Sequence, residues 1–220
     1  MQTAFSEDEW LLRLKSVRED PWEFLKAVIT LDPADKKNPL KPFPIHLEYL
    51  KYYVRCWQRY PKILVPKSRR MKMTWVNVAL YTWEAAFHVG RHYAFVSKKE
   101  DDSNDLVKKS EFILKHLDPT QIPQDFIPKY DLTYNKLSFI ETNSIIQGFA
   151  SGADQLRQFT FSGIFADEMA FWSDAEKMYS ASIPTLEGGG KLTGVSSPAP
   201  GFFKRLVFDT LDSEVDSVDS

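Results

Sequence analysis

The chain has 220 residues, 43% of them hydrophobic, which is enough for one substantial domain with its own core. Its 28 Lys and Arg residues face 30 Asp and Glu residues, so the net charge of −2 gives no sign of nucleic-acid binding. Five acids lie in the last twelve residues, and any DNA-binding surface would have to be local. The single cysteine, Cys56, excludes an internal disulfide or a thiolate metal cluster. No apolar run approaches the ~20 residues that cross a bilayer.

The first sixty residues predict helices separated by a loop. Ser6 and the acids after it indicate the start of a first helix, and Asp20-Pro21 indicates the start of a second helix that runs through Ile29. Residues 32–44 contain four prolines and predict a loop, and residues 45–59 predict a helix. We therefore divide the chain into an N-terminal helical extension (1–44), a main domain (45–208) and an acidic tail or shortened linker (209–220).

From residue 62 onward, strand-like and helix-like segments alternate. The expected strands are 62–65, 93–96, a hairpin within 137–146, 161–166 and 191–196. The expected helices are 73–88, 99–117, 174–183 and 202–208. This alternation is typical of an α/β fold with a mainly parallel sheet flanked by helices.

The most informative motif is an apolar strand that ends in two acids, Asp167 and Glu168. Such a strand brings its last carboxylates to the C-terminal edge of a parallel sheet, where ligands bind. This is the Walker B arrangement, in which Asp167 would hold Mg²⁺ and Glu168 would polarise the attacking water. A strand that simply ends in a solvated acidic turn is the alternative, because Asp-Glu pairs are common.

A basic loop, residues 66–74, occupies the place of a P-loop between a strand and a helix. The GxxxxGK[ST] pattern is absent, because the loop has no glycine and Met73 stands where the lysine is expected. Lys67 or Lys72 could supply the cation for the phosphates, and Thr74 the hydroxyl for the metal. We favour Lys67, because Lys72 stands where a second glycine should let the backbone approach the phosphate. A solvated basic turn is the alternative.

Two weaker candidates complete the set of polar segments. Ser196 and Ser197 follow a strand, where small hydroxyl residues can sense a phosphate or a catalytic water. Arg157 lies ten residues before Asp167 and could act as an arginine finger. An ordinary strand-to-turn junction and a surface arginine are the respective alternatives.

In order and spacing, these segments resemble the ATPase domain of the large terminase of tailed phages and prophages. The resemblance covers roughly residues 40–208. It rests on the deviant Walker A loop, the hairpin at 135–148, the Arg157 loop, the Walker B segment 164–171 and the segment Ser196-Ser197-Pro198. It implies a P-loop NTPase-like fold of the RecA/ASCE type.

The resemblance also implies roles for individual residues. Asp167 matches the metal-binding acid, Glu168 the catalytic acid, and Ser196 and Ser197 the motif that couples nucleotide state to movement. Arg157 matches an arginine that some members insert into the neighbouring subunit.

Within the Walker A loop, Arg69 matches an arginine that other members use in their own subunit. Lys67-Ser68 matches a variant with the phosphate lysine at the start of the loop. His46 stands where a glutamine usually binds adenine. The other nucleotide-binding candidates are Arg70, Met71, Lys72, Met73 and Thr74.

The function that the resemblance implies is Mg²⁺-dependent ATP hydrolysis that drives double-stranded viral DNA into a procapsid. The implied partners are the DNA, further copies of the chain in a ring, a portal protein and a small terminase subunit, with no membrane. The implied location is the host cytoplasm. Full-length members continue into an RNase H-like nuclease, and because this chain stops before that point we expect no DNA cleavage from it.

Two rival hypotheses remain. A superfamily 2 helicase has a similar Asp-Glu box and Ser/Thr motif, but it requires a second RecA-like domain. A non-catalytic nucleotide-binding or DNA-binding fragment would explain the glycine-free loop as decay. A Mg²⁺-dependent ATPase rate that is lost in Glu168→Gln separates these hypotheses.

Overall fold

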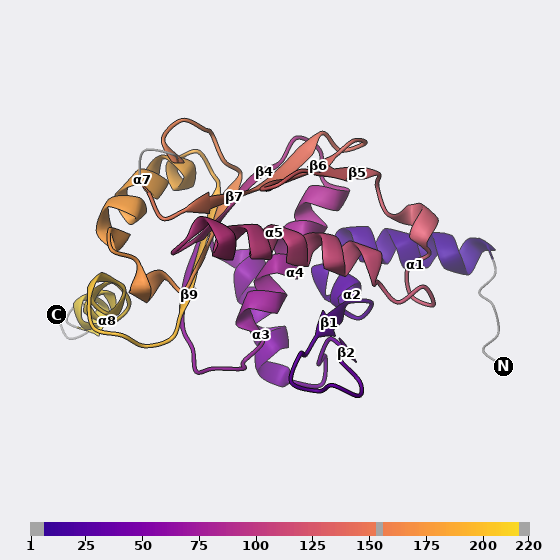
Figure 1. The fold of residues 1–220 in the computed structure, drawn as a ribbon, viewed down its shortest axis with the longest axis horizontal. Coiled ribbons are helices and arrows are strands. Elements are labelled where there is room, and N and C mark those ends of the chain that lie inside the picture. Colours follow the sequence, from indigo (N-terminus) through magenta and orange to yellow (C-terminus); the bar gives the residue numbers. More distant parts are fainter. Residues whose placement is uncertain (1–6, 153–155, 216–220) are drawn as a thin grey trace.

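The structure, a computed structural model, describes residues 7–152 and 156–215. It centres on a seven-stranded sheet with helices packed around it (Figure 1). The strand order is β3-β9-β8-β4-β7-β6-β5. The first five of these strands are parallel, and β6 and β5 continue the sheet in antiparallel register. Their bounds are β3 Lys62–Pro66, β4 His92–Ser97, β5 Tyr130–Leu132, β6 Lys136–Phe139, β7 Ser144–Ala150, β8 Gly163–Asp167 and β9 Lys191–Ser196.

Helices cover both faces of the sheet, because successive strand residues point to opposite sides. In β4, Phe95 packs in one core cluster with α3, α4 and α5, whereas Ala94 packs in a second cluster with α7 and α8. In β8, Phe165 and Ile164 divide in the same way. The helices are α3 Glu48–Arg59, α4 Met73–Phe87, α5 Glu100–Lys115, α7 Ala175–Glu187 and α8 Phe202–Val215, with short 3-10 turns η1 Gln124–Phe126 and η2 Met169–Phe171. The predicted fold class is thereby confirmed.

Helix α4 is the centre of the larger core and sets the position of the loop before it. Its residues from Val76 to Ala86 are nearly all buried, which is expected for a helix that is apolar on every side. Tyr81 is fully buried; its ring packs edge-on against Trp57 and Phe95, and its hydroxyl lies 3.0 Å from Thr193 Oγ1 in β9. These contacts hold α4 against the sheet. They thereby fix its N-terminus at the end of the basic loop that leads from β3 into α4.

The N-terminal region differs from the prediction in two places. Asp20 caps α2 (Pro21–Leu25) through a 2.8 Å bond from Trp22 N–H, but the helix does not continue to Ile29. Instead, β1 (Ile29–Leu31) begins where that helix was predicted to end and pairs antiparallel with β2 (Leu40–Pro42), which lies inside the segment 32–44 predicted to be a loop. The backbone N–H of Asp118 donates to the Ala27 carbonyl, so a distant segment takes up an acceptor that a longer helix would have used.

The two ends of the chain also bear on the expected domain division. Val17 of α1 (Glu7–Glu19) and Phe24 of α2 belong to the same core cluster as α4, so the N-terminal extension shares the main core. Helix α8 continues to Val215, so the tail expected from residue 209 is in part helical. Residues 216–220 lie outside the described residues. Within the described ranges, no helix combines the length and the apolar character that a membrane crossing requires.

The antiparallel edge of the sheet contains one strand more than predicted. The hairpin is confirmed, with β6 and β7 paired from Phe139↔Ser144 to Lys136↔Gln147. Tyr130–Leu132 adds β5 to its outer side through pairs such as Tyr130↔Phe139. A three-residue strand of this kind has too short a pattern to be found from its sequence.

Candidate functional site

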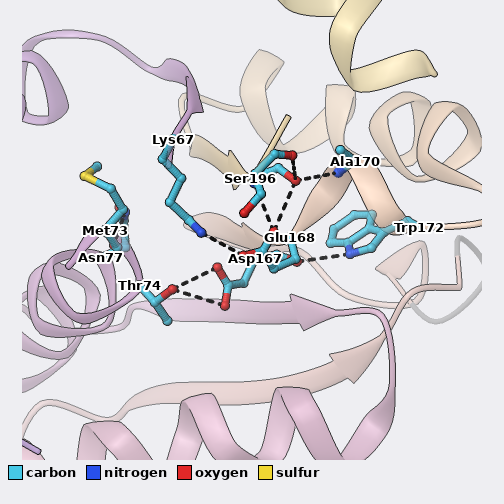
Figure 2. A network of polar contacts seen from close by, with 10 residues as sticks. Lys67, Met73, Thr74, Asn77, Asp167, Glu168, Ala170, Trp172 and Ser196 are labelled. Atoms are coloured by element: carbon cyan, nitrogen blue, oxygen red, sulfur yellow. Dashed lines mark hydrogen bonds and ion pairs between the residues drawn. The ribbon is translucent and has the colours of Figure 1, made fainter. Parts of the chain in front are cut away.

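Three neighbouring parallel strands end together at one edge of the sheet, and the candidate site lies there (Figure 2). Lys67 follows β3, Asp167 ends β8, and Ser196 ends β9 between them. The register pairs Pro66 with Ser196, and the N–H of Lys67 extends the ladder by a 2.8 Å bond to the Ser196 carbonyl. This strand order brings side chains that are 101 positions apart in the chain into contact.

Lys67 and Glu168 form an ion pair at the centre of the site. Lys67 Nζ lies 2.7 Å from Glu168 Oε1, and the lysine side chain is only 9% exposed, against 36% for the glutamate. The backbone of Glu168 has a φ of 51°, in the left-handed region that non-glycine residues seldom adopt. Such strained positions cluster at functional sites, where the surrounding structure holds them.

The second oxygen of Glu168 is bound by the segment after β9. The N–H of Ser197 donates to Glu168 Oε2 at 3.0 Å, and Ser196 Oγ lies 3.4 Å from the same oxygen. Partial burial works to raise the pKa of Glu168, but the hydrogen bonds from Lys67 and the Ser197 N–H outweigh it and leave the pKa lowered. Glu168 is therefore a carboxylate at neutral pH with both oxygens engaged.

Asp167 is in a different electrostatic state from its neighbour. Burial, with the negative charge of Glu168 adding to it, raises the pKa of Asp167 to about 6. The charge of Lys67 and a hydrogen bond from Thr74 oppose that shift. Thr74 Oγ1 donates at 3.1 Å to Asp167 Oδ1 and lies 3.4 Å from Oδ2. The negative charge of ionised Asp167 is thus only partly balanced by its neighbours. A bound cation would stabilise this ionised form, so the carboxylate is suited to bind one.

The basic loop adopts a glycine-like backbone without containing a glycine. Arg70 has a φ of 66° and Lys72 a φ of 55°, both in the left-handed region. Lys72 stands at the N-cap of α4 and makes no side-chain cap, so the first N–H groups of α4 have no partner from that side chain. Helix N-termini with such N–H groups attract anions.

Two cavities flank Asp167. The first, of ≈ 520 Å³, lies between the β1–β2 turn, the basic loop and the start of α4. The second, of ≈ 500 Å³, extends along α5 and past Glu168 and Ser197. Asp167 lines both, so the two spaces meet at the acid predicted to bind metal.

The structure brings six of the predicted residues into direct contact with one another. They are Lys67, Thr74, Asp167, Glu168, Ser196 and Ser197. This confirms the expectation that both acids lie at a strand end within reach of the basic loop. The roles assigned to these residues stay predictions.

The other predicted residues lie around this group or apart from it. Met71, Met73 and Lys72 line the first cavity with Arg70, whereas Arg69 lines the second. Ser68 is exposed. Arg157 and His46 are also exposed, and neither lines either cavity.

Sequence reasoning missed two contributors to these cavities. The turn residues Asp32–Ala34 line the first cavity, and Lys109 of α5 lines both. The turn was assigned to a loop without a role, and Lys109 looked like any other charge on a solvated helix. No sequence pattern marks either one, because only folding brings them to the loop.

The oxygen donors at the site fit a magnesium ion. Asp167 and Thr74 present a carboxylate and a hydroxyl side by side. Among the described residues, no cluster of three or more acidic, histidine or cysteine side chains is placed to hold a metal. Magnesium commonly takes one or two protein oxygens and completes its shell with water and substrate phosphates, so this small donor set suits it.

Comparison with solved structures identifies the fold. The chain superposes on the large terminase of bacteriophage HK97 with a TM-score of 0.62 and 12% identity, over 92% of this chain and 42% of that one. This chain has the fold of a phage large terminase. The large terminase of a thermophilic bacteriophage, in complex with ADP, gives a TM-score of 0.57 and 17% identity, over 76% of this chain and 42% of that one.

These likenesses confirm at the level of the fold the resemblance found in the sequence. At such identities they show the fold and not the activity. The chain spans about two fifths of the length of the terminases it matches, since it covers 42% of each. No family model and no curated protein matches the sequence.

Proposed function

We propose that this chain is the ATP-hydrolysing motor part of a large-terminase DNA-packaging machine. The observation that carries the proposal is the chain of contacts Lys67–Glu168–Ser197 at the ends of three adjacent strands, beside Thr74–Asp167. The terminase fold supports it, and one terminase of this fold was crystallised with ADP. Double-stranded DNA, a ring of copies, a portal protein and a small terminase subunit, in the host cytoplasm, belong to the same proposal.

Asp167 and Thr74 would hold Mg²⁺ in this proposal. When bound, the metal supplies positive charge that neutralises the phosphates during in-line attack by water. The loop residues 70–72 and the N-terminus of α4 line the first cavity, where their N–H groups would bind phosphate oxygens. In the fold as it stands, Thr74 already fixes the direction of the Asp167 carboxylate.

Glu168 would polarise the attacking water. Its lowered pKa keeps it ionised, as a hydrogen-bond acceptor for water must be. Both of its oxygens are bound, however, so one partner has to leave before a water can take its place. Lys67 is that partner, because an ammonium can leave a carboxylate for a more highly charged phosphate, whereas the Ser197 N–H is part of the backbone.

Ser196 and Ser197 would couple the state of Glu168 to movement. Ser196 Oγ accepts a 3.0 Å bond from the N–H of Ala170, and the N–H of Ser197 donates to Glu168, so the end of β9 is bound to the acid and to the turn that follows it. A shift of Glu168 would therefore pull on the segment that leads from β9 into α8. Arg69 in its own subunit, and Arg157 reaching into a neighbour, would supply transition-state charge, and His46 would border the adenine.

The decisive experiment measures nucleotide binding and Mg²⁺-dependent ATP turnover separately, for wild type and Glu168→Gln. We expect the variant to bind ATP with near wild-type affinity and to lose at least ~100-fold in turnover, because its neutral amide cannot polarise water. The exposed Glu176 of α7 offers a matched control, and Glu176→Gln should turn over ATP like wild type.

Separate measurement matters because hydrolysis in this proposal depends on assembly of the ring. Wild-type protein that binds no ATP at millimolar concentration would refute the proposal. So would a Glu168→Gln variant that hydrolyses ATP at the wild-type rate.

A further inference from the structure

Lys109 of α5 occupies the point where the two cavities meet. Apart from Asp167, it is the residue whose side chain lines both cavities. It comes from α5, whereas Lys67 and Arg69 come from the basic loop and Lys98 from the turn between β4 and α5. The side chain is half-buried, and its charge works to lower the pKa of Asp167, so its ammonium lies within electrostatic reach of that carboxylate.

The ammonium of Lys109 makes only one weak hydrogen bond within the described part of the protein. Its recorded hydrogen bond runs 3.5 Å to the carbonyl of Asp105, one turn earlier on the same helix and at the outer limit for such a bond. The carboxylate of Asp105 instead lies 3.4 Å from the neighbouring, exposed Lys108. Among the carboxylates of residues 7–152 and 156–208, none lies within ion-pair distance of Lys109 Nζ.

A half-buried cation without a close counter-ion is costly, and an anion in the adjoining cavity would compensate it. Asp167 alone cannot do this, because the proposed metal would take up its charge. An anion that sits against the metal at Asp167 would lie next to the ammonium. For a nucleoside triphosphate bound by the loop and α4, the part that reaches Asp167 is its far end.

We propose that Lys109 binds the terminal phosphate of the nucleotide, from the α5 side of the cavity and opposite to Lys67. This inference rests on the proposed nucleotide site and adds a contact to it from an element outside the predicted motifs. Lysine suits the role, because its ammonium binds phosphate as a point charge without a fixed bidentate geometry. Lys109 would then distinguish a triphosphate from a diphosphate. It would contact the nucleotide before hydrolysis and lose that contact once the terminal phosphate is removed.

The test compares dissociation constants for a non-hydrolysable ATP analogue and for ADP, both with Mg²⁺. We expect Lys109→Met to weaken binding of the triphosphate analogue about tenfold and that of ADP less than about threefold, the size expected for one charge-assisted contact. Lys109→Arg should keep most of the affinity for the analogue. Lys108→Met removes an exposed lysine one position away and should change neither constant.

The outcomes separate this inference from the proposed function. Wild-type protein that binds neither nucleotide overturns both. Wild-type binding with an unchanged Lys109→Met variant, or with equal losses for the analogue and ADP, overturns the assignment of Lys109 alone. Urea unfolding checks that Lys109→Met is folded, and Lys109→Gln replaces it in the same comparison if it is not.

Discussion

We predict that the buried charge of Asp167 lowers the stability of the nucleotide-free protein. Its pKa is raised from 3.8 to about 6, mainly by burial. One pKa unit corresponds to about 1.4 kcal/mol, so ionised Asp167 costs the nucleotide-free fold on the order of 3 kcal/mol. Asp167→Asn removes the charge and keeps an oxygen that can accept the Thr74 hydroxyl. We therefore expect the variant to be more stable than wild type at pH 8, by roughly 1–3 kcal/mol.

The raised pKa of Asp167 also predicts how the stability of the protein changes with pH. A group whose pKa is higher in the folded than in the unfolded state stabilises the fold when protonated, and this stability is lost as pH rises. For Asp167 the loss falls between about pH 4 and pH 6 and is complete above that window. The stability advantage of Asp167→Asn should therefore shrink steadily as the pH is lowered from 7 to 4.

The assay is urea unfolding of wild type and Asp167→Asn in EDTA without nucleotide, at several pH values from 4 to 8. Glu168→Gln is the internal contrast: the pKa of Glu168 is lowered, so its ionised form favours folding and its loss should destabilise the protein at pH 8. An Asp167→Asn variant less stable than wild type at pH 8, or a stability difference independent of pH, would refute the reasoning.

Two further predictions concern the cations of the proposed site. Lys67→Ala should abolish turnover and weaken ATP binding, while Lys72→Ala keeps measurable turnover, because Lys67 is held among the acids and Lys72 has the left-handed backbone of a glycine position. Nucleotide titrations and ATPase rates decide this, and an inactive Lys72→Ala beside an active Lys67→Ala reverses it. Arg157→Ala should bind ATP like wild type but fail to hydrolyse it in the assembled motor; loss of binding in the isolated chain would instead give Arg157 a structural or ground-state role.

The elements found from the sequence are those whose pattern is local and long. The strand that ends in Asp167 and Glu168 is a run of buried side chains, and α4 is apolar on every side. The structure contains both elements where the sequence predicted them. Their continuous apolar patterns reflect burial on every side in the core. The β1–β2 pair was missed for the opposite reason: each strand has three residues, and their pairing across the intervening turn depends on the core that α2 completes.

The candidate site likewise combines features that the sequence determines with contacts that only the tertiary structure creates. The sequence determined that an acid pair, a basic loop and two serines each follow a strand, and so lie at one edge of a parallel sheet. Only the tertiary structure placed β9 between β3 and β8, which brings Ser197 to one oxygen of Glu168 and Lys67 to the other. Strand order depends on how helices pack across both faces, and that packing sums weak contacts between distant segments. For the same reason Lys109, an ordinary charge in its helix, becomes a neighbour of Asp167 only once α5 packs against the sheet.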